Sequence, residues 1–474
     1  MKGNQFKGFS GASLKKALLY FFMAFMLFPL KGQEIAVPSE NTEKIIIDRE
    51  QFVKTFVQKA AIVDSLRYKI QSAEADYNKV LAQYFPKIKF VFGMGPHPKY
   101  EYERASIQQN EDGEYYFQES RWDKYYFDWD EYGIAIRMSG EFVMPIFTFG
   151  KIMNGLDASK ANIELKKAES LIGEMKVRKE AALYYWSWVM VNEILAFMEP
   201  AVVKVDEAEE KLKTMLYEEK EGVRQKDLIK LRIEKEKIAY NLKKLQLQKD
   251  TLKSVLDTVL GDNWVLADST VSAVKFEKTF DEIVDFTFNS SPYSKMMQNG
   301  LSAYEHLYHL EICKLLPDFG LVGSYSYKYT SSVYEKNYPY PDSPYNGWDG
   351  EVGIGLSLSL NFVEQGRNVQ KAKAEWNAFK SQTAFLKDTY PFKIKEKYNT
   401  LKSLESQIFH IGKARKYAKG WMTSEFGNYE NGLNSPNDLI DAVKLYFENE
   451  LLYIQSVFDY NMKIEEINEM SGMR

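Results

Sequence analysis

Four segments of the chain alternate apolar and polar residues in a pattern that is typical of β-strands. They cover residues 87–95, 132–144, 318–330 and 351–362. In the last segment, for example, Val352, Ile354 and Leu356 alternate with glycine and serine. Because successive side chains of a strand point to opposite faces, each segment predicts one apolar face and one polar face.

The order of elements occurs twice along the chain. Residues 48–261 predict a helix, two strands and a long helical hairpin, and residues 262–474 predict the same series. The tripeptide Asp-Leu-Ile stands at Asp227 in the first half and at Asp438 in the second, in each case near the start of the last helix. The sequence therefore predicts an internal duplication.

The first 32 residues are typical of an export signal peptide. Four lysines precede an uncharged run, residues 17–30, that is too short to cross a bilayer as a helix. A short buried helix is the alternative interpretation. Cleavage would leave residues 33–47 as a linker and lower the formal net charge from −4 to −9, because five lysines and no acid are lost. We do not expect such an acidic chain to bind nucleic acid.

The strands suit two environments. Beyond the signal there is no run of about 18 apolar residues, so the segments would have to cross a membrane as a closed barrel. Four strands cannot close a barrel of useful bore, so several chains would share one. A soluble sheet with one buried face has the same alternation. The Lys- and Glu-rich helices favour the membrane barrel, since helices with a narrow apolar stripe can form the wall of a water-filled tunnel. The helices of a solvated rod would show the same pattern.

The chain resembles the TolC family of trimeric outer-membrane efflux and secretion channels from about residue 48 to residue 470. The resemblance depends on paired motifs in the two halves: "YFPKIKF" and "LLPDFGL", "PIFTFGKIMNGLDASKAN" and "LSLNFVEQGRNVQKAKAEW", "EGVRQKDLI" and "NGLNSPNDLIDA". It implies a mixed α and β fold. Each of three protomers would contribute four strands to one transmembrane β-barrel, continuous with a long periplasmic α-helical barrel.

This resemblance implies a passive export duct in the outer membrane of a Gram-negative bacterium that extends into the periplasm. Its partners would be outer-membrane lipid, a periplasmic adaptor and an inner-membrane transporter. Gly150 and Gly366 would mark the transitions from strand to tunnel helix. The alternative is a periplasmic coiled-coil scaffold or adaptor without a pore. The chain has no nucleotide-binding, hydrolase or zinc-protease motif, and we expect neither an enzyme nor a cofactor.

Two pairs of residues match the family's adaptor-contact points at the hairpin tips: Gly222 with Val223, and Gly432 with Leu433. Glu221 and Asn431 stand where the family has a leading apolar residue, which leaves the choice of adaptor open. Glycines required by a left-handed turn are the alternative explanation.

Asp438 and Asp441 match two aspartates that ring the periplasmic aperture in the family. A spacing of three places both carboxylates on one helix face, so a trimer would gather six around its axis. Such a ring would favour cations, and mutual repulsion would raise some of the carboxyl pKa values. In the first repeat, Lys230 stands where a second acid would follow Asp227. The alternative is that Asp438 only stabilises the first turn of its helix.

The segment from residue 96 to residue 131 is rich in aromatic and acidic residues. It predicts an external loop, either with aromatic side chains at the membrane interface or fully solvated. Its role stays open, and no ordered ligand spacing indicates calcium binding. His306 and His309, with Glu305, are interpreted as surface residues of a polar helix, so no metal site is predicted.

Overall fold

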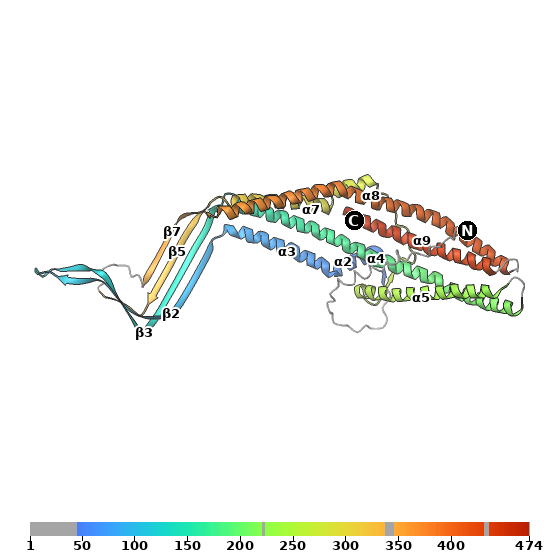
Figure 1. Cartoon of the computed structure of the whole chain (residues 1–474), viewed down its shortest axis with the longest axis horizontal. Coiled ribbons are helices and arrows are strands. Elements are labelled where there is room, and N and C mark those ends of the chain that lie inside the picture. Colours follow the sequence, from blue (N-terminus) through green and yellow to red (C-terminus); the bar gives the residue numbers. More distant parts are fainter. Residues whose placement is uncertain (1–44, 220–222, 337–345, 431–435, 474) are drawn as a thin grey trace, which may run out of the picture. The chain divides into compact units, whose positions relative to one another are not determined.

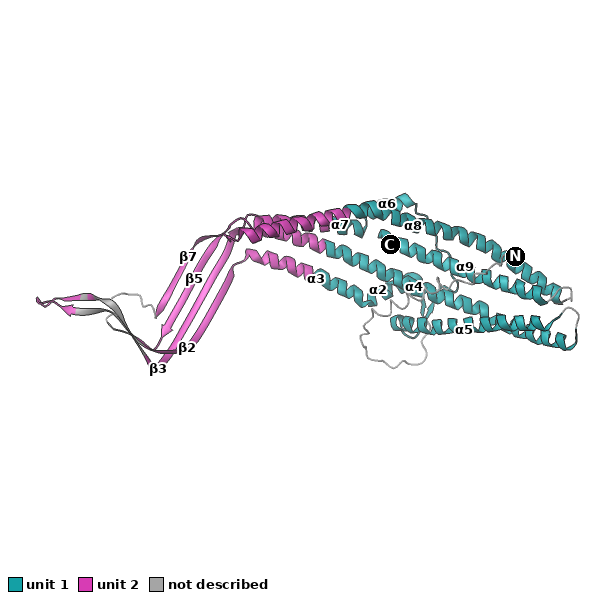
Figure 2. Ribbon diagram, in the orientation of Figure 1, with its two compact units in different colours: residues 1–70, 165–297, 384–474 teal, residues 71–164, 298–383 magenta. Residues whose placement is uncertain are grey.

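The computed structural model describes residues 45–219, 223–336, 346–430 and 436–473. The predicted signal peptide lies outside this part of the chain. The chain forms two compact units (Figure 2). Of the described residues, unit 1 comprises residues 45–70, those within 165–297 and those from 384 to 473, and unit 2 comprises those within 71–164 and 298–383. Each predicted repeat contributes to both units, so the units do not coincide with the repeats.

Long helices alternate with strands along the described chain (Figure 1). The α-helices are α2 (Arg49–Lys59), α3 (Ala61–Leu81), α4 (Lys151–Tyr217), α5 (Gln225–Leu260), α6 (Phe280–Asn289), α7 (Pro292–Cys313), α8 (Phe362–Glu430) and α9 (Pro436–Ser471), and a 3₁₀ turn covers Ala82–Tyr84. The strands are β1 (Ile45–Ile47), β2 (Lys87–Gln109), β3 (Tyr115–Phe147), β4 (Trp264–Leu266), β5 (Asp318–Thr330), β6 (Val333–Lys336) and β7 (Gly347–Ser357).

Unit 1 has a hydrophobic core between its helices. Phe52 and Phe56 of α2 pack with Tyr185 of α4, Leu256 of α5 and Ile454 of α9, all of them buried. The buried hydroxyl of Tyr185 donates a 2.7 Å hydrogen bond to the Asp268 carboxylate, and burial together with this bond raises the tyrosine pKa. The core explains why α2 has an apolar stripe, whereas α3 is mostly exposed.

Unit 2 contains a five-stranded sheet in the order β6-β2-β3-β5-β7. The four long strands are antiparallel, and β6 pairs in parallel with a short stretch of β2. β5 has the predicted bounds. β7 ends at Ser357 rather than at the predicted residue 362, because Ser357 pairs with Asp318, the first residue of β5, and the sheet offers no partner beyond it.

β2 and β3 are much longer than the predicted segments 87–95 and 132–144. They have 23 and 33 residues. Ala135 of β3 pairs with Thr330, the last residue of β5, and on the far side of this position β2 and β3 continue to pair with each other. The sequence hides this extension because charged residues occur on both faces there, which removes the alternation of apolar and polar positions.

Candidate functional site

One face of the sheet is apolar along its four long strands. The register places on it Ile88, Phe90, Phe92 and Met94 of β2, Ile136, Met138, Phe142 and Met144 of β3, Leu321, Tyr325, Tyr327 and Tyr329 of β5, and Val352, Ile354 and Leu356 of β7. The side chains of Ile88, Val352 and Ile354 are 74%, 77% and 70% exposed. Soluble monomers rarely expose so continuous an apolar surface, so this face requires an apolar cover.

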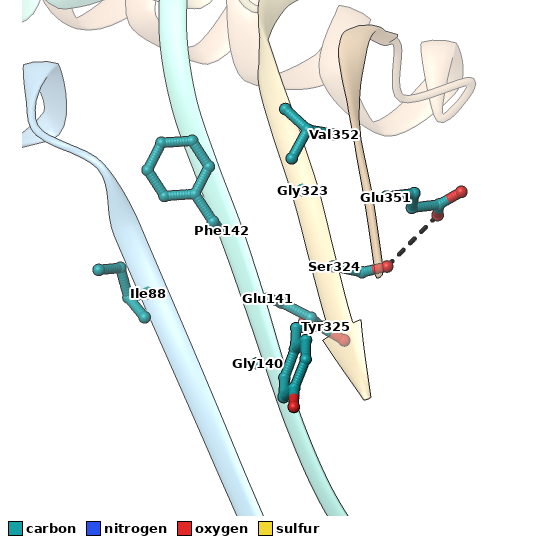
Figure 3. Close-up of a pocket in the computed structure, with 9 residues that line it drawn as sticks. All are labelled: Ile88, Gly140, Glu141, Phe142, Gly323, Ser324, Tyr325, Glu351 and Val352. Atoms are coloured by element: carbon teal, nitrogen blue, oxygen red, sulfur yellow. Dashed lines mark hydrogen bonds between the residues drawn. The ribbon is translucent and has the colours of Figure 1, made fainter. Parts of the chain in front are cut away.

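The apolar face is hollowed at two glycines. Gly140 of β3 and Gly323 of β5 leave an open hollow of about 310 Å³, and Ile88, Phe142 and Val352 also line it (Figure 3). A Cβ atom on Gly140 would meet no atom within 4 Å. At Gly140 the hollow therefore results from a missing side chain, whereas a Cβ atom on Gly323 would lie 3.3 Å from the Glu351 carbonyl oxygen.

The opposite face of the sheet carries charged and small side chains in rows across the strands. One row aligns Lys89, Glu141, Ser324 and Glu351. The Lys89 ammonium lies 4.0 Å from the Glu141 carboxylate, and the Ser324 hydroxyl donates a 3.4 Å hydrogen bond to Glu351 (Figure 3). The sheet is thus divided into an apolar face and a polar face, as the alternation of residues predicts.

The two predicted transition glycines differ in their surroundings. Gly150 has a φ of +86°, a conformation that favours glycine, and α4 begins at the next residue. Gly366 is the fifth residue of α8, which begins at Phe362. The second transition from strand to helix therefore lies at residues 358–361, because β7 has already lost its partner strand at Ser357.

The aromatic and acidic segment is mostly β-strand rather than the predicted loop. It forms the outer parts of β2 and β3, which meet at a turn where the Asn110 carbonyl accepts the Gly113 N–H at 3.0 Å. Register shifts interrupt this ribbon at two places, and Lys99 beside the first shift pairs with Glu131 at 2.8 Å. The segment therefore continues β2 and β3 as a ribbon beyond the end of β5, and β6 pairs with the ribbon at residues 100–103 of β2.

The first turns of α5 and α9 contact each other in unit 1. Asp227, the third residue of α5, is only 2% exposed. Its carboxylate accepts the backbone N–H of Arg224 at 3.1 Å and a hydrogen bond from the Asn437 side-chain amide of α9. This buried carboxylate, which accepts from the residue before α5 and from Asn437 of α9, holds the first turns of the two helices together.

Lys230 and Asp441 form an ion pair between the same two helices. Their ammonium and carboxylate groups lie 2.7 Å apart, and Lys230 also donates to the Asn437 side-chain oxygen at 3.3 Å. Asp438 is exposed in the first turn of α9. The structure thus brings Asp441 to a lysine of the first hairpin. The sequence placed this lysine at the equivalent position but gave no sign that the two would pair.

Glu209 links the two helices of the first hairpin. Its carboxylate accepts hydrogen bonds from Arg232 at 2.9 Å and from Lys235 at 2.8 Å, and lies 3.2 Å from the Lys213 ammonium. The hydrogen bonds from Lys235, Arg232 and Lys213 lower the pKa of Glu209 to about 2. This acid therefore stays charged at neutral pH and stabilises the pairing of α4 with α5.

An elongated cavity of about 1730 Å³ lies between the two hairpins of unit 1. All four long helices line it, with Met198 of α4, Leu231 of α5, Phe426 of α8 and Leu451 of α9 among its apolar side chains. The cavity interrupts the packing between the two hairpins, although Phe197 of α4 packs on Phe447 of α9 with ring centroids 4.7 Å apart.

Other predicted site residues fall outside these contacts. Gly222, Gly432 and Leu433 lie outside the described residues, and Val223 is half-buried just before the start of α5. His306 Nδ1 lies 3.5 Å from the Asn154 side-chain oxygen. In the part of the chain that the structure describes, no three His, Cys, Asp or Glu side chains are grouped closely enough to hold a metal ion. Within the same ranges, no helix has both the length and the apolar character needed to cross a membrane.

Known structures share this fold. OprN, described as an outer-membrane channel, matches with a TM-score of 0.69 at 13% identity, over 90% of this chain and 90% of that chain. CusC, described in terms of transmembrane channel formation, matches with a TM-score of 0.66 at 14% identity, over 94% of this chain and 99% of that chain. The CmeC outer-membrane channel of Campylobacter jejuni matches with a TM-score of 0.66 at 14% identity, over 94% of both chains.

No family model and no curated protein matches the chain. In each comparison the likeness extends over 90% or more of this chain and of the matched chain, and it establishes that this chain has the fold of these channels. The fold class predicted from the sequence is thereby confirmed for the single chain.

Proposed function

We propose that the chain is the outer-membrane channel subunit of a tripartite efflux or secretion system, a passive duct for export across the periplasm and the outer membrane. One observation carries this proposal: the sheet has a strongly exposed apolar face and a charged opposite face, in a chain with the fold of outer-membrane channels. Lipid would cover the apolar face, and water would fill the space beside the polar face.

The edges of the sheet support the proposal that the chain forms a homotrimer. In the described residues, β7 has no strand beyond it, and β2 is covered only where four of its residues pair with β6. Exposed edges of long strands invite pairing with another chain. Joining the β2 edge of one protomer to the β7 edge of the next would close one barrel from three chains and satisfy both edges.

The periplasmic gate is proposed at the first turns of α9. Asp438 and Asp441 of three protomers would surround the axis, and Lys230 would accompany each Asp441. Each protomer would then contribute two carboxylates and one ammonium group, so the ring would have half the net negative charge of the carboxylates alone. The cavity between the hairpins gives them room to separate when the gate opens.

The adaptor-contact points are proposed at Gly222 with Val223 and at Gly432 with Leu433. They would bind a periplasmic adaptor, which would join the duct to an inner-membrane transporter. The resemblance of the tip sequences to the TolC family supports this part of the proposal. A left-handed turn that needs glycine would explain Gly222 and Gly432 without any partner.

Cell fractionation separates the duct from a pore-free periplasmic scaffold. The duct predicts that the mature protein sediments with the outer membrane, needs detergent for extraction and migrates differently on gels before and after heating. A scaffold predicts release with the periplasmic fraction. Recovery of the folded protein in the periplasm without detergent would overturn the duct.

A further inference from the structure

Two cations face each other on the polar face of the sheet. Arg137 of β3 and Lys328 of β5 are direct cross-strand partners, and both side chains are exposed. Like charges directly opposite each other destabilise a sheet. Among the described residues, no carboxylate forms an ion pair with either side chain, so the repulsion is not offset within the chain.

The surroundings of these two cations are open. Gly93 of β2 and Gly347 of β7 complete their row, and a Cβ atom on Gly93 would meet nothing within 4 Å. Asp349 is the nearest acid by register, one row away and opposite Ser326. Cross-strand neighbours in this diagonal relation have Cα atoms roughly 7–8 Å apart. The described residues therefore leave the Gly93 side of the row open to a ligand, while Asp349 stays within reach of the long Lys328 side chain.

Elsewhere on the same face the charges are balanced differently. The row of Lys89 also contains Glu141 and Glu351, so one cation meets two acids. The row of Lys87 contains no second cation. On the described polar face, the row of Arg137 places two cations directly opposite each other with no acid in the same row, and Asp349 is diagonal to Lys328.

We propose that Arg137 and Lys328 form a binding site for multivalent oxyanions, such as phosphate, sulfate and polycarboxylates. The planar guanidinium offers paired N–H donors, and the ammonium adds a mobile point charge beside it. An oxyanion between them replaces repulsion with two attractions. The location of this site in the bore rests on the proposed function. In a shared barrel the site would occur once per protomer around the lumen, so anionic cargo would pass it.

Binding of inorganic tripolyphosphate to the detergent-solubilised full-length mature protein tests the site by calorimetry at low salt. Arg137→Gln with Lys328→Gln removes two unit charges and is expected to weaken binding about tenfold. Arg137→Lys with Lys328→Arg keeps the charge and the affinity. Lys87→Gln with Lys89→Gln is the matched control, since it removes two cations from the same face and leaves binding unchanged. Equal losses in the two glutamine pairs, or no loss in the first, overturn the proposal.

The same proteins in planar bilayers separate this site from the duct. Tripolyphosphate is expected to block wild-type and control channels, and to require an about tenfold higher concentration with Arg137→Gln and Lys328→Gln. Site-dependent binding without any conductance upholds the site and overturns the duct. Conductance without site-dependent binding upholds the duct and overturns the site.

Discussion

The second helices of the two hairpins begin with the same tripeptide but have different surroundings. Asp227 of α5 is buried and accepts hydrogen bonds from Arg224, just before its own helix, and from Asn437 of α9, whereas Asp438 at the equivalent place in α9 is exposed. Three residues further along, Lys230 of α5 pairs with Asp441 of α9. Equivalent positions of the two repeats are thus complementary. The first hairpin provides the buried Asp227 and the cation Lys230, and the second provides two exposed aspartates.

Replacing Asp227 with alanine gives the largest expected effect. The Arg224 N–H and the Asn437 amide would lose a common acceptor in a buried place, at a cost of about 2 kcal/mol. Hydrogen exchange should become faster in the first turns of α5 and α9. Asp438→Ala is the control at the equivalent position and should cost less than about 0.5 kcal/mol. Equal effects of the two substitutions would contradict the comparison.

Glu209→Gln tests the charge network within the first hairpin. Because the folded-state pKa of about 2 lies below the ordinary value of 4.5, this acid stabilises the fold above its ordinary pKa, and the contribution is lost as the pH falls towards 2. The thermal midpoint of Glu209→Gln should be a few degrees lower than that of the wild type at pH 7, and the difference should shrink below pH 4. Glu210→Gln, which removes an exposed partner of Lys213, is the control. A difference that is independent of pH would refute the assignment.

The exposed acids of the second hairpin are tested by conductance. Asp438→Ala with Asp441→Ala should raise single-channel conductance roughly twofold and weaken block by multivalent cations, because the aperture loses its carboxylates. Asn437, on the same turn of α9, is not substituted, so its hydrogen bond to Asp227 should remain in this variant. Currents and block identical to those of the wild type would rule out a gate at these residues.

The ion pair between the hairpins should have the smallest effect on stability. Both side chains are partly exposed, and a double-mutant cycle of Lys230→Met with Asp441→Leu should give a coupling of about 0.5 kcal/mol that decreases with salt. The exchanged pair, Lys230→Asp with Asp441→Lys, should recover the coupling. A coupling that persists at high salt would mean that the contact is not mainly electrostatic.

The sequence predicted much of the sheet because alternation is a local signal. Val352, Ile354 and Leu356 are spaced two apart, and the register places them together on the apolar face. Pro317 stands directly before β5, which begins where the pattern predicted. The outer ribbon of β2 and β3 escaped prediction because its stability comes from pairing between strands and not from a buried face.

The charge pairs could not be predicted, since each depends on contacts between distant residues. Arg137 and Lys328 are 191 positions apart, and only the register between β3 and β5 makes them neighbours. Lys230 and Asp441 are separated by 211 positions. The repeat relates these two residues to each other but does not show that they touch. Gly366 was expected at a transition because it matches Gly150 in the motif, but the end of the partner strand moves the transition to residues before Phe362.

Whether three chains form one conducting duct is tested by planar-bilayer conductance of the detergent-purified mature protein, with the mass of the oligomer determined in the same preparation. We expect a trimer that opens discrete channels, and only when the apolar face of the sheet can insert into lipid. A water-soluble species that never conducts, in a preparation shown to be folded, would contradict this expectation.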